Sequence, residues 1–124
     1  MTGEEIRKLQ RVLLTLPVSY QDSDNIQTVI AFLITALVYF EQPLLKKSTK
    51  ARKATIFITE TSHVKVTFTT ENGEEQTKDP FCRFSNSQFT KHNYKKVFNY
   101  LRENLSEYNN FFKFDNENLS ITIG

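Results

Sequence analysis

The stretch HVKVTFTTENGEEQTK, residues 63–78, decides the fold class. Apolar and polar side chains alternate over its first arm, which puts Val64, Val66 and Phe68 on one face and Lys65, Thr67 and Thr69 on the other. Asn72-Gly73 follows at once, and this pair readily adopts the positive φ angles of a type I′ turn. The segment therefore predicts an antiparallel β-hairpin. Its second arm, residues 74–78, is wholly polar and is expected to be an edge or frayed strand.

Two further regions of the sequence predict β-strands. Residues 54–60, ATIFITE, are rich in Ile, Phe and Thr. Residues 111–115 and 119–123 flank an Asn-Glu-Asn turn and predict a C-terminal β-hairpin. The connector of residues 79–89 is rich in turn-forming residues, and its three Phe side chains are expected to anchor it to the core.

Two segments have the period of amphipathic helices. Residues 3–16 begin after a Thr2-x-x-Glu5 capping box and end before Pro17. A second helix begins after Ser87 or Thr90 as its N-cap. Its apolar residues recur three or four positions apart along one face, and they are Tyr94, Val97, Phe98, Leu101, Leu105 and Tyr108.

A third helical segment, IQTVIAFLITALVYF at residues 26–40, is apolar on nearly every side. Fifteen helical residues rise about 22 Å, which is less than the roughly 30 Å of a bilayer core. The basic residues that follow would nevertheless suit the flank of a membrane span. We expect instead a central helix buried on all sides, covered either by its own fold or by a second copy of the chain.

The 124 residues therefore predict a single α+β domain, residues 1–124. Its order is two N-terminal helices, an antiparallel β-hairpin, an amphipathic helix and a C-terminal β-hairpin. Cys82 is the only cysteine, so no intramolecular disulfide can form. The N-terminus lacks the layout of a signal peptide, and we expect an intracellular protein of the cytoplasm or nucleus. The use of Asn, Lys, Phe and Ile suggests an AT-rich genome, viral or microbial.

Basic residues form three sets, although the net charge is only +2. The first set has no acid among its members and is expected on an irregular link between helix and sheet; it comprises Lys46, Lys47, Lys50, Arg52 and Lys53. The second lies opposite the apolar face of the last helix and comprises Lys91, His92, Lys95, Lys96 and Arg102. The third comprises Arg7, Lys8 and Arg11. Three such surfaces could converge into one groove for nucleic acid, with salt-dependent binding.

The alternative for each set is an ordinary solvated face, balanced on the helices by nearby glutamates. The first set also has the outline of a short nuclear-localisation signal, a pattern that many unrelated sequences share. The nucleic-acid-binding residues expected from the sequence are Lys46, Lys47, Lys50, Arg52, Lys53, Lys91, Lys95 and Lys96.

Enzymatic chemistry has little support in this sequence. None of the three glycines opens a helix after a strand, as phosphate-cradling loops require. His63, Cys82 and His92 are too widely spaced for a typical zinc site. A Cys82–His92 nucleophile pair would lack a glycine to form a strained turn. We expect no enzyme, no cofactor, no metal and no small-molecule substrate.

The sequence thus favours a non-enzymatic binding or assembly domain. The all-round apolar helix predicts a homodimer, and the basic sets predict contact with nucleic acid or another acidic partner. Two alternatives stay open: a protein-interaction or structural protein, of viral origin or not, that does not bind nucleic acid, and a small membrane-associated protein.

Overall fold

The chain folds into helices packed on a five-stranded antiparallel sheet, which confirms the predicted α+β class. The computed structural model describes residues 1–18, 23–42, 49–78 and 88–124. In chain order the elements are α1 (Gly3–Leu14), α2 (Ser23–Val38), β1 (Ala51–Ile58), β2 (Val64–Thr70), β3 (Glu75–Lys78), α3 (Lys91–Asn104), the 3-10 helix η1 (Ser106–Tyr108), β4 (Phe112–Asp115) and β5 (Ser120–Ile123).

Both predicted hairpins are present, β2–β3 and β4–β5, and β1 lies between them. The strand order is β3-β2-β1-β5-β4, so β3 is an edge strand as its polar sequence predicts. β1 pairs antiparallel with β2 on one side and with β5 on the other, where Ala54 lies opposite Ile123 and Ile56 opposite Ile121. The last strand of the chain therefore lies inside the sheet, between β1 and β4.

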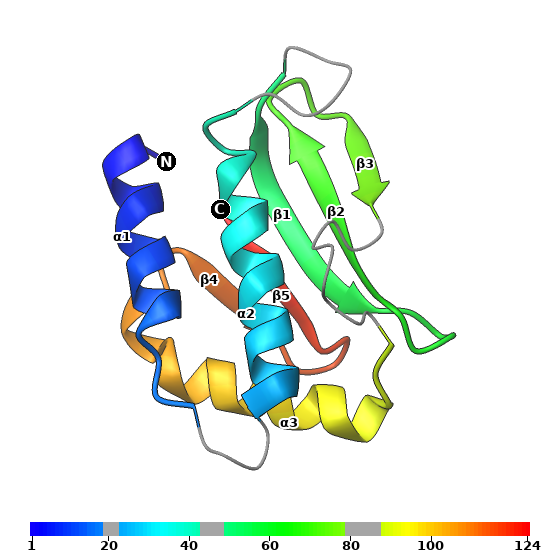
Figure 1. Ribbon diagram of the computed structural model, residues 1–124. Coiled ribbons are helices and arrows are strands. Elements are labelled where there is room, and N and C mark those ends of the chain that lie inside the picture. Colours follow the sequence, from blue (N-terminus) through cyan, green and yellow to red (C-terminus); the bar gives the residue numbers. More distant parts are fainter. Residues whose placement is uncertain (19–22, 43–48, 79–87) are drawn as a thin grey trace.

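One face of the sheet packs against the helices (Figure 1). α2 lies across the middle of this face with α1 beside it, and α3 crosses at the end where β1 finishes. The inward side chains of the strands are buried, among them Ile56, Val66, Phe68, Ile121 and Ile123. The outward positions carry threonines that hydrogen-bond across strands, Thr55 to Thr122 at 3.2 Å and Thr67 to Thr77 at 2.9 Å.

The first basic set lies partly in the sheet and not wholly on an irregular link, because only Lys50 of its described members lies outside a regular element. β1 begins at Ala51, three residues before the predicted strand, so Arg52 and Lys53 belong to the sheet. The register shifts between Ala51 and Lys53, which places an irregularity at this point. Because of that shift Ala51 and Ala54 both face inward and are buried, whereas the two cations between them are exposed.

α2 is also the segment that raised the question of a membrane span. The helix extends from Ser23 to Val38, so it begins three residues before the predicted start and ends two residues before the predicted end. Within the four described ranges, no helix has both the length and the apolar character needed to cross a membrane.

The predicted helix caps form as expected. The Thr2 hydroxyl accepts from the backbone N–H of Glu5 at 3.1 Å, and the Glu5 carboxylate accepts from that of Thr2 at 2.9 Å. Thr90 is the N-cap of α3, and its hydroxyl accepts from the backbone N–H of Asn93 at 3.1 Å.

We expect Thr90→Ala to lower the free energy of unfolding by about 1 kcal/mol, because one helix N–H loses its acceptor. Urea unfolding followed by circular dichroism measures this change. Thr90→Ser keeps the acceptor and is the matched control. If the serine variant lost as much stability as the alanine variant, the cap would not be the cause.

Candidate functional site

α1 and α2 are held together by polar contacts at one end of their seam. Arg7 Nη1 lies 3.6 Å from Glu41 Oε1, just beyond the end of α2. Further along, the Gln10 side-chain amide donates to the backbone carbonyl of Ile34 at 3.3 Å. The backbone of Gly3 also comes close to Glu41, since a Cβ on Gly3 would lie 2.6 Å from Glu41 Oε1. These contacts fix the position of α1 along α2.

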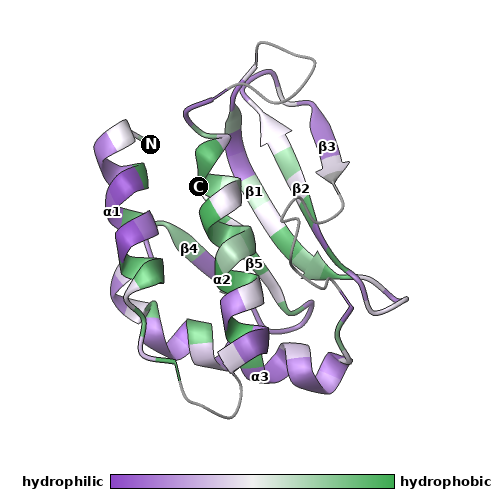
Figure 2. Cartoon of the chain, in the orientation of Figure 1, coloured by the Kyte–Doolittle hydropathy of each residue, from purple (hydrophilic) through white to green (hydrophobic). Residues whose placement is uncertain are grey.

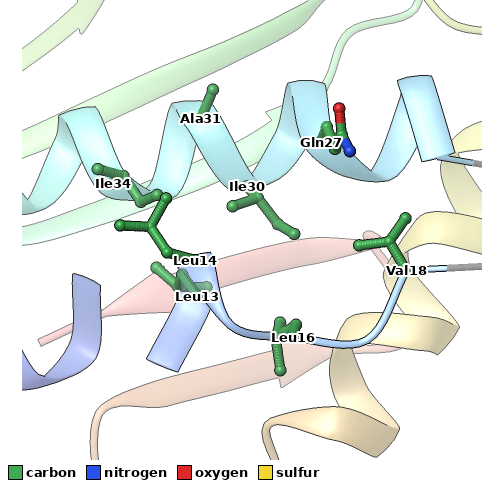
Figure 3. A pocket seen from close by; sticks show the side chains of 8 residues that line it. All are labelled: Leu13, Leu14, Leu16, Val18, Gln27, Ile30, Ala31 and Ile34. Atoms are coloured by element: carbon green, nitrogen blue, oxygen red, sulfur yellow. The ribbon is translucent and has the colours of Figure 1, made fainter. Parts of the chain in front are cut away.

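Beyond them the seam opens into an apolar groove of about 480 Å³ (Figure 3). It lies between the C-terminal end of α1 with the residues after it and the adjacent part of α2. Leu14, which lines the groove, is 70% exposed and extends the apolar surface beside it. No charged side chain lines the groove, whose residues are Leu13, Leu14, Leu16, Val18, Gln27, Ile30, Ala31 and Ile34.

The outward side of α2 continues this uncharged surface. Asp24 is the only charged residue of the helix. Gln27 is exposed, and half-buried Ala31, Ile34 and Val38 follow on the same side. Figure 2 shows hydrophobic colour over much of α2 and hydrophilic colour over the first turns of α3. A solvent-facing helix side normally carries charge.

Of the two arrangements expected for residues 26–40, complete cover by the chain's own fold is not found, and cover by a second copy stays a prediction. The inward side of α2 is buried against the sheet, with Leu33, Ala36 and Leu37 each 0% exposed. The outward side lies in contact with solvent because α1 covers only one flank. We name the groove residues together with Val38 the α1–α2 face.

At the start of β1 the described cations of the first basic set have carboxylates close by. The backbone N–H of Glu71 donates to the carbonyl of Lys50 at 3.1 Å. Lys53 pairs with Thr69, which pairs with Glu75, so Lys53 and Glu75 are two strand spacings apart, about 10 Å. At physiological ionic strength the Debye length is about 8 Å, so exposed charges at this separation interact weakly there and more strongly at lower salt.

Three cations and three carboxylates thus share this corner of the sheet. The cations Lys50, Arg52 and Lys53 are exposed, as are the acids Glu71, Glu74 and Glu75. The sequence has no acid within this set, and the hairpin brings acids to its described members from about twenty residues away. Lys46 and Lys47 lie outside the described residues.

The solvent face of α3 carries mostly positive charge, unlike the corner of the sheet at the start of β1. Six of its residues are exposed, and four of them are Lys or Arg, one is His92 and only Glu103 is acidic. Lys91, Lys95 and Lys96 form no hydrogen bond or ion pair with side chains in the described part of the chain. Lys91 and His92 occupy the first turn, where the helix dipole disfavours cations and no acid is present.

Arg102 completes this face near the other end of α3. Its guanidinium donates to the side-chain oxygen of Asn116 and lies 5.8 Å from the centre of the Phe98 ring. Phe98 packs edge-to-face on Phe114 of β4, with 5.5 Å between the ring centres. The side chain of Arg102 is therefore held in place by both a hydrogen bond and a cation–π contact.

The described residues of the first basic set and the start of α3 lie at opposite ends of β1. The start of α3 is tied to the β1–β2 turn, because the backbone N–H of Phe89 donates to the carbonyl of Ser62 at 2.9 Å. This turn follows the end of β1, whereas Lys50, Arg52 and Lys53 lie at the beginning of the strand. Ile58, the last residue of β1, is five residues or about 16 Å beyond Lys53. In the third set, Arg7 is occupied by Glu41.

The described residues contain few groups that suit catalysis. No cluster of three or more His, Cys, Asp or Glu side chains forms among them, and Cys82 of the considered Cys82–His92 pair lies outside them. Burial raises the pKa of Tyr94, so its hydroxyl stays neutral. His63 Nδ1 lies 3.1 Å from the hydroxyl of Thr61, and His92 is exposed.

The arrangement can therefore bind in two ways: an apolar partner surface at the α1–α2 face, and phosphate or carboxylate groups along α3. We did not predict the exposure of Leu14 from the sequence, although Leu14 lies outside the repeating apolar positions of the amphipathic helix that the sequence predicts over residues 3–16. Compared with known proteins, the chain matches no protein family, no curated protein and no solved structure. What the chain does must be inferred from these two surfaces.

Proposed function

We propose that this chain is a non-enzymatic assembly domain that forms a homodimer through its α1–α2 face. The observation that carries this proposal is the uncharged outward side of α2 beside an apolar groove, with Leu14 70% exposed at its rim. The cores of protein interfaces are depleted in charge in the same way. Covering this face removes apolar surface from water, which favours association.

A second copy is the partner that this surface fits best. The face offers a protruding side chain, Leu14, next to a hollow lined by Ile30, Ala31 and Ile34. Under two-fold symmetry each copy inserts its leucine beside the groove of the other, so one surface serves both partners. Full burial of each leucine contributes roughly 2 kcal/mol. The small side chain of Ala31 lets two α2 helices approach closely.

We expect Ala31→Asp to convert the dimer to a monomer, because the substitution places a carboxylate in the middle of the apolar contact. The dissociation constant should rise at least about 100-fold, the range of a disrupted interface hot spot. Size-exclusion chromatography with light scattering measures this change on wild-type and variant chains.

The matched control is Asn109→Asp, which adds the same charge at an exposed residue that does not belong to the α1–α2 face. It should remain dimeric. A wild-type chain that is monomeric at about 10 µM, a concentration at which ordinary homodimers associate, would overturn the proposal. A dimer that Ala31→Asp leaves intact would show that another surface forms the contact.

The second candidate function is contact with nucleic acid, alone or together with dimerisation. It is supported by the exposed lysines and arginines, which outnumber acids on α3, and a dimer would double these charges. Both functions fit a protein of the cytoplasm or the nucleus. Absence of binding to a labelled DNA or RNA duplex at low salt would end this candidate and leave protein assembly by itself.

A further inference from the structure

We propose that the surface that contacts nucleic acid is the exposed face of α3, formed by Lys91, Lys95, Lys96 and Arg102, and not the lysine-rich segment that precedes the sheet. This inference rests on the proposed nucleic-acid contact and assigns its site. It reverses the order suggested by the sequence, in which the segment of residues 46–53 has the denser positive charge.

The first reason is the balance of charge around each set. At the start of β1, the three described cations share their corner with Glu71, Glu74 and Glu75. A phosphate chain laid there would meet carboxylates as well as cations, and the repulsion would offset part of the attraction. On α3 itself one acid, Glu103, stands against four cations, and the acids of the β4–β5 turn, Asp115 and Glu117, lie only beside its Arg102 end.

The second reason is the regular spacing of the α3 cations. Lys91, Lys95 and Arg102 are four and seven residues apart, so they lie along one flank of the helix. Arg102 follows Lys91 by eleven residues, which corresponds to about 16 Å along the helix axis. One strand of a duplex advances about 3.4 Å per nucleotide, so this row runs beside roughly five phosphates. Lys96 adds a cation on the neighbouring flank.

The third reason is that the row is rigid. Lys91 and Lys95 project from a helix whose inward residues are almost fully buried, with Tyr94, Val97, Phe98 and Leu101 each at most 1% exposed. Arg102 is fixed over Phe98 and by Asn116. A charge row on an ordered helix loses less conformational entropy on binding than a row that must first be ordered. A rigid row of one sign suits a uniformly charged backbone better than an irregular acidic peptide.

The test compares two variants that lose the same charge at opposite ends of the sheet. The first is the triple variant Lys91→Gln, Lys95→Gln and Lys96→Gln, and the matched control is Lys50→Gln, Arg52→Gln and Lys53→Gln. Fluorescence anisotropy of a labelled 20-base-pair DNA duplex gives the association constant as a function of salt concentration. Circular dichroism checks that both variants fold, as expected for changes at exposed sites.

The α3 variant should weaken binding more than about 10-fold at 50 mM salt and flatten the slope of log K against log salt by about 2 to 3, one for each phosphate that the variant no longer neutralises. The control should change the slope by less than about 1. A further variant, Lys46→Gln with Lys47→Gln, tests the rest of the first set and should also leave the slope nearly unchanged.

Each other outcome contradicts a specific statement. If the wild-type chain does not bind the duplex at 50 mM salt, the proposed nucleic-acid contact itself fails. If it binds but either variant of the first set loses as much affinity as the α3 variant, the assignment to α3 is overturned while nucleic-acid binding stands. If poly-glutamate displaces the labelled duplex as well as unlabelled duplex does, the partner is an acidic protein segment and not nucleic acid.

Discussion

Replacing Ala36 by aspartate is expected to remove a large part of the stability of the fold. Ala36 is 0% exposed on the inward side of α2, packed over the sheet. A carboxylate at this position would lose its hydration without gaining a charged partner, which costs on the order of 4 kcal/mol or more. The whole stability of a domain is about 5–15 kcal/mol. Circular dichroism should show the urea transition at a much lower midpoint than in the wild-type chain.

Ala31→Asp is the matched control for this prediction, because it makes the same change five residues earlier on the same helix. Ala31 lies on the outward, half-buried side, where water can hydrate the carboxylate. Compared at a concentration at which the wild-type chain is also monomeric, this variant should fold with a small loss of stability, of the size set by helix propensity, below about 1 kcal/mol. Equal effects at the two positions would mean that α2 does not have one inward and one outward side.

Phe68→Ala should lower the free energy of unfolding by about 3–5 kcal/mol, the cost of a large cavity in a packed core. Phe68 is 0% exposed on β2, and its ring meets that of Tyr39 edge-to-face with 5.2 Å between the ring centres. Truncation removes both the buried area and this aromatic contact. Urea unfolding at constant pH measures the change.

Phe57→Ala is the control for Phe68, since it removes the same ring from the opposite face of the sheet. Phe57 pairs with Lys65 on the outward side and is only half-buried. Its truncation should cost less than about 1.5 kcal/mol, because the removed ring is partly hydrated in the folded chain. A cost as large as that of Phe68→Ala would show that the outward face is covered.

The parts of the fold that follow from local patterns could be predicted. Strict alternation and Asn72-Gly73 predict the first hairpin, and the structure pairs Val66 with Lys78 and Thr69 with Glu75. Thr2 and Glu5 predict the first cap, and the apolar repeat predicts the buried side of α3. Each of these signals depends on residues a few positions apart, whose geometry the backbone itself sets.

The parts that depend on distant residues could not be predicted. The pairing of β1 with β5 joins segments more than sixty residues apart, and no local pattern specifies it. For the same reason the sequence did not predict the acids of the β2–β3 turn beside Lys50, because strand pairing brings them to that position. α2 could not be oriented either: a helix with little polarity difference between its sides gives no periodic signal, so tertiary packing decides which side is buried.

The position of β5 between β1 and β4 also constrains how the chain is made. While the ribosome is still synthesising residues after α3, β1 has a bare edge where β5 will pair. The nascent chain therefore carries α2 and an unfinished sheet with exposed apolar surface until residue 123 has left the exit tunnel. Synthesis that stalls before that point would leave a partly folded chain with exposed apolar surface, which is a substrate for chaperones that hold unfolded chains.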